Sequence, residues 1–329
     1  MERPEADVAV LIPCLNEART IGGTVLGFRA SLPGARVLVF DNASDDGTAA
    51  EAARAGAEVV AVPERGKGHV VRRMFAEIDA DIYVVADGDA TYDPADAPVL
   101  VERLRAGRLD MVVGRRAGLA DAAGRPGHAL GNRLFNRLFR AMFGPGFRDI
   151  FSGYRVFSRR FVKSFPALST GFETETELSV HAAMLRLPHA EVEVGYRERP
   201  EGSASKLSTW RDGLRILMIF GLLMKEVKPF QFFSAAAAVT LGLSLAFMAP
   251  VLAEYFATGL VLRFPTWIAA TALLMMALLL FVCGVILDSL ARSRLEQKRL
   301  HSLTIPKLPP LAAGEGAGAA RVSRSHDAA

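Results

Sequence analysis

The sequence predicts an α/β protein, with a mostly parallel sheet covered by helices on both faces, followed by an interfacial segment and a hairpin of two transmembrane helices. Up to about residue 210, short apolar runs alternate with helix-like segments, as in chains built from strand–helix–strand units. Polar side chains gather where several of these apolar runs end. After residue 228, two long stretches contain no charged side chain.

The expected strands are continuous apolar runs, which indicate burial on both faces of a parallel sheet. They cover residues 8–13, 37–40, 59–62, 82–86 and 111–114. Helical spacing or alanine-rich composition predicts helices between them, over residues 17–32, 45–55, 68–78 and 94–106. Ligands of such sheets bind beyond the carboxyl ends of the strands, so the polar strand ends are expected to form one site.

Composition narrows the class of protein. The 329 residues carry a net charge of only +4, so no overall basic field indicates a nucleic-acid partner. The two cysteines, Cys14 and Cys283, lie in a strand-like run and a membrane-like run, and no disulfide is expected between them. The first residues lack a basic segment followed by a long apolar one, so no cleavable signal peptide is expected.

The C-terminal third predicts a membrane anchor. Within residues 229–290, two helices of about 230–253 and 264–287 are expected, because each uncharged run exceeds the roughly 20 residues that cross a bilayer. A buried hairpin in a soluble core is the alternative, but soluble helices are rarely apolar all round. Basic residues precede the first run and follow the second, namely Lys225, Lys228, Arg292, Arg294, Lys298 and Arg299. This bias predicts a multi-pass protein of the cell membrane with the N-terminal domain and both termini in the cytoplasm.

Two further segments flank this anchor. Residues 207–228 place a short apolar run among basic residues, which predicts an interfacial amphipathic helix region. Residues 291–329 are basic at first and then rich in Pro, Ala and Gly, which predicts a tail that becomes disordered after about Thr304.

The most informative motif is VVADGDATYDP, residues 84–94. Asp87 and Asp89 flank Gly88, and carboxylates two residues apart in a strand point to the same side. They repel each other unless a cation lies between them, and hard oxygen ligands suit Mg²⁺ or Mn²⁺ bridging to a substrate diphosphate. A plain polar turn is the alternative. Asp93, which precedes Pro94, is expected to cap the following helix instead.

Other strand ends carry weaker signals. In DNASDDGT, residues 41–48, Ser44 or Asp45 is expected to cap the next helix, which leaves Asp41 and Asn42 to bind a base or ribose. Lys67, in Gly66-Lys67-Gly68, stands at a helix N-terminus that can approach a phosphate, although no complete P-loop is present. A scattered basic set indicates anion capture, namely Arg115, Arg116, Arg148, Arg155, Arg199 and Lys206. In GFETETEL, residues 171–178, Glu173 and Glu175 are further site candidates, on either a strand or the start of a helix.

Together these motifs resemble a known family. The order LIPCLNEA, FDNASDDGT, RGKG, VVADGDATYDP, VVGRR, GNRLFNRLF, DIFSGYRVF, GFETETEL and RPEGSASKL is similar to that of family 2 glycosyltransferases of the GT-A fold, a Rossmann-like fold. More narrowly, it resembles the dolichol-phosphate mannose synthase group of polyprenyl-phosphate glycosyltransferases. The resemblance runs from about residue 8 to about 228 and implies a GT-A domain over residues 1–206.

The resemblance implies roles for single residues. The nucleotide sugar would be bound by Pro13, Asn16, Glu17, Asp41, Lys67, Asp87 and Gly88. Asp87 and Asp89 would hold the metal, and Thr91 stands where relatives often carry Gln, which leaves its part in the metal shell open. The catalytic set would be Asp89, Arg115, Arg199 and Lys206. The acceptor phosphate would be bound by Arg133, Ser152 and Arg155, beside a helix that carries Asn132 and Asn136.

The resemblance also implies a reaction. It is inverting transfer of a hexose from a nucleotide diphosphate sugar to a polyprenyl phosphate, dolichyl or undecaprenyl, at the membrane surface, with Mg²⁺ or Mn²⁺ as cofactor. UDP-glucose, UDP-N-acetylglucosamine and GDP-mannose all remain open as donors, and a homo-oligomer is also compatible with the sequence. One alternative is a processive polysaccharide synthase, although the Q-x-x-R-W motif and the additional membrane helices of such enzymes are absent from the sequence. Another is a non-catalytic, membrane-anchored nucleotide-binding scaffold.

Overall fold

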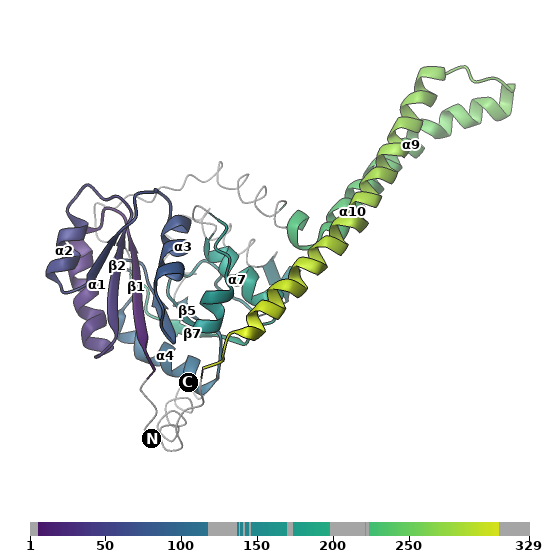
Figure 1. Ribbon diagram of the computed structural model, residues 1–329. Coiled ribbons are helices and arrows are strands. Elements are labelled where there is room, and N and C mark those ends of the chain that lie inside the picture. Colours follow the sequence, from purple (N-terminus) through teal and green to yellow (C-terminus); the bar gives the residue numbers. More distant parts are fainter. Residues whose placement is uncertain are drawn as a thin grey trace. The chain divides into compact units, whose positions relative to one another are not determined.

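A single seven-stranded sheet forms the centre of the N-terminal domain (Figure 1). The computed structural model describes residues 6–117, 137, 139–140, 142–144, 146–169, 174–197, 221 and 224–308. In spatial order the strands are β3 (Glu58–Ala61), β2 (Arg36–Asp41), β1 (Val8–Cys14), β4 (Ile82–Val85), β6 (Arg155–Ser158), β5 (Met111–Arg116) and β7 (His189–Val194). The expectation of an α/β protein with a mostly parallel sheet is confirmed.

One strand runs against the others. β6 pairs antiparallel with both β4 and β5, whereas all other pairs are parallel. Because of this reversal the first residue of β6, Arg155, pairs with Val85, the last residue of β4. The loop that leads into β6 therefore lies at the carboxyl edge of the parallel strands, where a ligand site is expected.

Helices cover both faces of the sheet. One face carries α1 (Ala18–Ser31), α2 (Thr48–Arg54) and α4 (Ala97–Ala106), the last preceded by a 3₁₀ turn, η1 (Pro94–Asp96). The other carries α3 (Lys67–Glu77), α6 (Arg159–Ser164) and α7 (Thr174–Leu185). As predicted, Asp93 caps the chain before η1, since its side chain accepts a hydrogen bond of 3.0 Å from the Ala95 amide.

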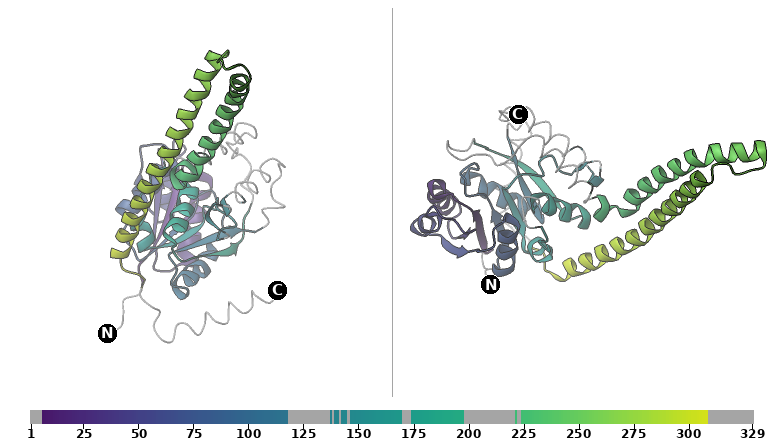
Figure 2. Two further views of the ribbon diagram at one scale, coloured as in Figure 1. Left: turned by 90° about the vertical axis from the view of Figure 1, so that its right-hand side faces the viewer. Right: turned by 90° about the horizontal axis from the view of Figure 1, so that it is seen from above.

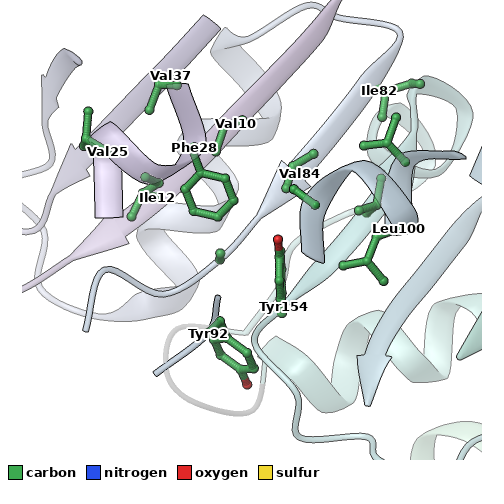
Figure 3. Close-up of a cluster of buried hydrophobic side chains, with 14 of the residues drawn as sticks. Val10, Ile12, Val25, Phe28, Val37, Ile82, Val84, Tyr92, Leu100 and Tyr154 are labelled. Atoms are coloured by element: carbon green, nitrogen blue, oxygen red, sulfur yellow. The ribbon is translucent and has the colours of Figure 1, made fainter. Parts of the chain in front are cut away.

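The core beneath α1 and α4 is closed by aromatic side chains (Figure 3). Phe28 of α1 meets the ring of Tyr154 edge-on, with 6.1 Å between centroids, and Tyr92 lies 5.4 Å from Tyr154. Aromatic pairs at such separations add about 0.5–1.5 kcal/mol beyond the burial of their area. Tyr92 follows the acidic turn and Tyr154 precedes β6, so this cluster fixes two loops of the carboxyl edge against the core.

Two long helices follow this domain: α9 (Pro229–Thr258) and α10 (Phe264–Thr304). Both are long and apolar enough to cross a membrane by length and composition. They run side by side (Figure 2); the Ser244 hydroxyl donates a 2.8 Å hydrogen bond to the Ala270 carbonyl, and the rings of Phe230 and Phe281 lie 6.0 Å apart. The predicted pair of apolar helices is confirmed as a candidate transmembrane hairpin.

The chain divides into two compact units, residues 1–206 with 298–329, and residues 207–297. Most of the expected interfacial segment, 207–228, lies outside the described residues, although residues 224–227 are helical. The basic start of the expected tail, residues 291–304, is helical and continues α10. Leu308 then packs against the core of the first unit. Residues 309–329, where disorder was expected, are outside the described part of the chain.

Candidate active site

The carboxyl ends of β1, β2, β4 and β5 lie along one edge of the sheet, as the polar strand ends predicted. Cys14 and Asp41, the last residues of β1 and β2, are direct partners in the register. The acidic turn follows β4, and Arg115 and Arg116 end β5. Because these strands are parallel, functional groups distant in sequence meet here.

Asp41 carries an unusual carboxylate. The side chain is 7% exposed, and one oxygen, Oδ2, accepts a hydrogen bond of 3.3 Å from the Ser44 amide. Among the described residues the other oxygen, Oδ1, has no hydrogen-bond partner. A buried carboxylate oxygen without a donor is costly, so this atom fits a ligand N–H or O–H.

Asn42 has a different task from the one expected. Its amide nitrogen donates to the carbonyls of Val62, at 3.1 Å, and Glu64, at 2.6 Å, and its oxygen accepts from the Gly66 amide at 2.8 Å. All three contacts shape the loop that leads into α3. Asn42 therefore positions Lys67, the first residue of that helix, rather than facing a base or ribose.

The loop after β1 is tied to the loop after β2. Asn16 adopts a left-handed backbone with φ 56°, and its side-chain oxygen accepts from the Asp45 amide at 3.0 Å. The amide of Glu17 donates to the Thr48 hydroxyl at 2.8 Å, and that of Ala18 to Asp46 at 3.0 Å. The neighbouring loop thus satisfies amides at the start of α1 that would otherwise lack partners. Pro13, in contrast, is buried within β1.

The predicted cap of α2 is corrected by these contacts. The Asp46 carboxylate, not Ser44 or Asp45, accepts from the amide and the hydroxyl of Thr48, the first residue of α2. The Ser44 hydroxyl instead accepts from the Asn16 amide at 2.9 Å.

The acidic turn lies beyond the strand, because β4 ends at Val85. Asp89 is buried, and its Oδ1 accepts from the amide and the hydroxyl of Thr91, at 3.1 and 2.6 Å. Thr91 therefore orients the Asp89 carboxylate. Gly88 allows the turn to lie close to β1, because a Cβ there would collide with the Glu17 carboxylate and the Cys14 thiol.

Lys67 joins this turn to α7. Its Nζ lies 2.6 Å from Asp87 Oδ1 and 2.6 Å from Glu175 Oε1. Although burial by itself lowers the pKa of Lys67, the two carboxylates outweigh it and raise the pKa well above its ordinary value. The ammonium is therefore charged throughout the physiological pH range.

The loop before β6 lies against Asp87. The Cα of Gly153 leaves no room for a side chain, since a Cβ would collide with the Asp87 carboxylate. The Tyr92 hydroxyl accepts a 2.9 Å hydrogen bond from the Gly153 amide. Burial, and secondarily the Asp87 charge, raise the pKa of Tyr92 to about 12, so this hydroxyl stays protonated.

Ser152 and Arg155 hold this loop from inside. Ser152 is fully buried, and its hydroxyl donates to the Gly114 carbonyl at 2.5 Å. Arg155 is 1% exposed, and its guanidinium donates to the carbonyls of Ser152, at 2.8 Å, and Ile150, at 2.6 Å. Direct contact of either side chain with an acceptor phosphate would require the loop to move.

The end of β5 provides two arginines that differ in exposure and in their ion-pair partners. Arg115 pairs with Glu193 of β7 and remains partly exposed. Arg116 binds both oxygens of Asp149, at 2.9 and 2.8 Å, and lies 5.4 Å from the ring centre of Tyr196. Burial alone lowers the pKa of Arg116, but Asp149 outweighs burial and raises it. Arg115 is thus the more accessible of the pair.

Several expected site residues cannot be compared with the geometry. Arg133, Arg199 and Lys206 lie outside the described residues, as do Asn132, Asn136 and Glu173. Their predicted roles stay predictions.

The donor set fits a divalent cation that arrives with a diphosphate. Within the described parts of the chain, no group of three or more His, Cys, Asp or Glu side chains could hold a metal ion. Mg²⁺, however, is commonly bound by only one or two carboxylates together with substrate phosphates. Asp87 and Asp89 supply such a pair, and Thr91 already orients one of them.

The model of glycosyl transferase family 2 matches residues 9–165, which cover the site from β1 to α6. Glycosyltransferase AglJ of Haloferax volcanii is 37% identical over 255 residues, which are 74% of this chain and 82% of the relative. The chain belongs to glycosyl transferase family 2. An uncharacterized protein of Shigella flexneri is 48% identical over 153 residues, which are 46% of this chain and 94% of that protein.

Solved structures of glycosyltransferases share this fold. Glucosyl-3-phosphoglycerate synthase from Mycobacterium tuberculosis, in complex with Mn²⁺, UDP and glucosyl-3-phosphoglycerate, superposes with a TM-score of 0.55 at 26% identity, covering 67% of this chain and 79% of that one. The same enzyme with Mg²⁺ and UDP gives a TM-score of 0.52 at 27% identity, covering 65% and 79%. The GT-A fold is confirmed, and the chain is a family 2 glycosyltransferase that acts on nucleotide sugars. Family membership favours an enzyme over the scaffold alternative.

Proposed function

We propose that the protein transfers a hexose, with inversion, from a nucleotide diphosphate sugar to a polyprenyl phosphate at a membrane surface. The observation that carries this proposal is the presence, in one chain, of a family 2 site and two helices long and apolar enough to cross a membrane. Such an anchor would hold the site at the membrane surface, where lipid phosphates lie, and this supports a lipid acceptor. The glucosyl product of the superposed mycobacterial enzyme supports a hexose donor.

The donor would bind along the edge from β2 to β4. Asp41 Oδ1 would accept a hydrogen bond from the base or ribose, because it has no other donor among the described residues. Asp87 and Asp89 would hold Mg²⁺ or Mn²⁺, which when bound neutralises the diphosphate and stabilises the leaving nucleoside diphosphate. Lys67 would add a positive charge beside the same group.

The acceptor needs little help from a protein base. A phosphate monoester has a second pKa of about 6 and is largely dianionic at neutral pH. Its oxygen is therefore already a nucleophile, and the main task of the site is to reduce repulsion between two anions. Arg115, Arg133, Arg199 and Lys206 are proposed for this task, whereas Ser152 and Arg155 are proposed to hold the loop beside it.

The membrane arrangement follows from charge. We propose that α9 and α10 anchor the chain as a multi-pass protein, with the catalytic domain and both termini in the cytoplasm. In the connector, Arg263 pairs with Glu254 at 2.7 Å, so the only basic residue between the two helices is neutralised. The site would then act on lipid phosphates of the cytoplasmic leaflet.

One assay tests the proposal. The full chain in detergent is incubated with undecaprenyl or dolichyl phosphate and with Mg²⁺ or Mn²⁺. UDP-glucose, UDP-N-acetylglucosamine and GDP-mannose are supplied in separate reactions, and the mass of the lipid product is measured by mass spectrometry. The expected product gains one sugar from one of these donors. Repeated additions would indicate a processive synthase. A parallel reaction replaces the lipid with 3-phosphoglycerate, the acceptor moiety in the product of the superposed mycobacterial enzyme. Transfer to that compound and not to the lipid would overturn the proposed acceptor.

A further inference from the structure

Lys67 lies between two carboxylates that come from separate elements. It opens α3, Asp87 follows β4, and Glu175 is the second residue of α7. Both ion pairs measure 2.6 Å. The exposed fractions of the three side chains are 16%, 25% and 10% for Lys67, Asp87 and Glu175, so bulk water screens these charges only partly.

The ammonium and a divalent cation need the same carboxylate. Asp87 Oδ1 already binds Lys67, and the Asp87 carboxylate lies against the Gly153 Cα on another side. A cation that binds at Asp87 therefore reduces the attraction between Asp87 and Lys67, and the ammonium in turn reduces the attraction of Asp87 for the cation. Glu175 gives Lys67 a second partner that does not belong to the acidic turn.

We propose that Lys67 is an internal counterion that neutralises Asp87 before the metal and donor bind, and that Glu175 is a positioning residue that retains the ammonium beside the donor diphosphate afterwards. The inference rests on the proposed function for its metal and its diphosphate. It assigns Glu175 to the site through its contact with Lys67.

The opposite effects of two variants distinguish this device from a simple structural ion pair. Lys67→Gln removes the competitor and leaves Asp87 with a stronger field, so Mn²⁺ binds more tightly when nucleotide is absent. Glu175→Gln leaves Asp87 as the only carboxylate partner of Lys67 among the described residues, so Mn²⁺ binds more weakly. A purely structural role predicts that both variants weaken binding, because Lys67→Gln leaves two carboxylates without their cation and Glu175→Gln removes one of the two ion pairs that hold Lys67 in place.

The experiment is Mn²⁺ titration of the full chain in detergent, with free Mn²⁺ followed by electron paramagnetic resonance, with and without UDP. Without UDP, we expect Lys67→Gln to raise the affinity for Mn²⁺ about tenfold and Glu175→Gln to lower it about tenfold. A tenfold change corresponds to about 1.4 kcal/mol of binding free energy. With UDP, the gain in Mn²⁺ affinity that the nucleotide causes is smaller in Lys67→Gln than in the wild type. Glu177→Gln is the matched control, because that carboxylate lies on the same helix and binds Leu168 and Ser169.

The double variant separates coupling through Lys67 from a direct effect of charge. In the Lys67→Gln background, Glu175→Gln is expected to change Mn²⁺ affinity by at most about threefold, because the residue that links Glu175 to Asp87 is gone. An undiminished tenfold effect there, or a loss of affinity in Lys67→Gln alone, overturns the inference. If Lys67→Gln does not fold, Lys67→Arg keeps the charge and should bind Mn²⁺ as the wild type does; a gain in affinity in Lys67→Arg would also overturn it. The readout needs no acceptor, so absence of a lipid product would refute the proposed function without affecting this result.

Discussion

At the scale of single residues, the carboxylate of Asp41 fits the proposed role in nucleotide binding. A carboxylate that is 7% exposed keeps one oxygen without a donor among the described residues. Such an atom is stabilised when a ligand donates to it, and hydrogen bonds to charged groups contribute about 1.5–3 kcal/mol. The side-chain polar atoms of the neighbouring Asn42 are engaged by the protein, so Asn42 supports the loop before α3, whereas Asp41 is the residue proposed to bind the nucleotide.

Asp41→Asn should therefore weaken nucleotide binding. The amide cannot offer an acceptor in place of both carboxylate oxygens, and we expect the affinity for UDP to fall at least about tenfold by titration calorimetry. Asp45→Ala is the control, because it removes one charge from an exposed position of the same loop. Equal affinity for UDP in wild type and Asp41→Asn would contradict the assignment.

Asp89→Asn should abolish metal-dependent transfer while the fold survives. The carboxylate is fixed by the two donors of Thr91, and an amide ligates hard cations more weakly. We expect initial rates to fall about 100-fold or more at saturating Mn²⁺, consistent with loss of electrostatic stabilisation of a leaving group. Asp93→Asn, a helix-cap change four residues later, should retain transfer. Wild-type rates in Asp89→Asn would refute the metal assignment.

The sequence predicted which residues gather at the edge but not how they contact one another. Asp87 and Lys67 were both expected near the nucleotide, yet their ion pair depends on where α3 begins relative to the end of β4. Glu175 reaches Lys67 from a different helix and about 100 residues later along the chain. The bidentate pair of Arg116 and Asp149 was missed for the same reason. Single-sequence patterns carry no information on such pairings, because these depend on three-dimensional packing.

At the scale of elements, continuous apolar runs and helical periodicity were reliable guides, whereas mixed patterns were not. The helix expected over 17–32 is observed at Ala18–Ser31, and the strand expected over 59–62 at Glu58–Ala61. β7 was missed because His189–Val194 is mostly half-buried and lacks an apolar run. β6 was missed because it has only four residues, Arg155–Ser158, directly after a loop.

The start of α7 was predicted only as one of two alternatives, a strand or a helix, and the structure shows the helix; the sequence could not decide between them because α7 is buried on nearly every side. Its buried residues include Glu175, Thr176, Ser179 and His181 as well as apolar side chains, so no amphipathic period marks it. These polar groups instead have partners in the structure. Glu175 binds Lys67, and His181 Nε2 lies 3.1 Å from the Ser164 hydroxyl.

Burial of His181 makes stability depend on pH. Desolvation, with a smaller contribution from Lys298, lowers the pKa of His181 to about 3. The unfolded chain, with an ordinary pKa near 6.5, binds more protons between these values, so stability falls as pH falls through about 6.5 towards 3. At pH 5.5 the loss is about 1 kcal/mol.

The measurement is the thermal midpoint of the full chain at pH 7.5, 6.5 and 5.5. His181→Asn should flatten the decline between pH 6.5 and 5.5, although its midpoint at pH 7.5 is lower if the hydrogen bond with Ser164 is lost. His301→Asn, an exposed position of α10, should leave the slope unchanged. Parallel slopes for wild type and His181→Asn would show that another group governs the acid sensitivity.

At the scale of the whole molecule, the two apolar helices were evident from the absence of charge alone. The sequence did not show where the second helix ends, because residues 291–304 are basic and were assigned to the tail, whereas the structure includes them in α10. Their helical state follows from continuity with α10, and Leu308 shows that the chain beyond it returns to the core of the first unit. Charge composition therefore predicted the orientation in the membrane but could not predict where the helix ends.

That orientation gives the last prediction. If α9 and α10 span the membrane as a hairpin, the connector at residues 259–263 faces away from the catalytic domain, and the end of α10 faces the cytoplasm. In a Cys283→Ser background, Leu260→Cys places a thiol in the exposed connector, and His301→Cys places one near the end of α10. The remaining native Cys14 is buried. A membrane-impermeant maleimide on intact cells should label Leu260→Cys and spare His301→Cys until the membrane is permeabilised. Labelling of both in intact cells would refute the cytoplasmic tail, and labelling of neither would place the connector on the cytoplasmic side.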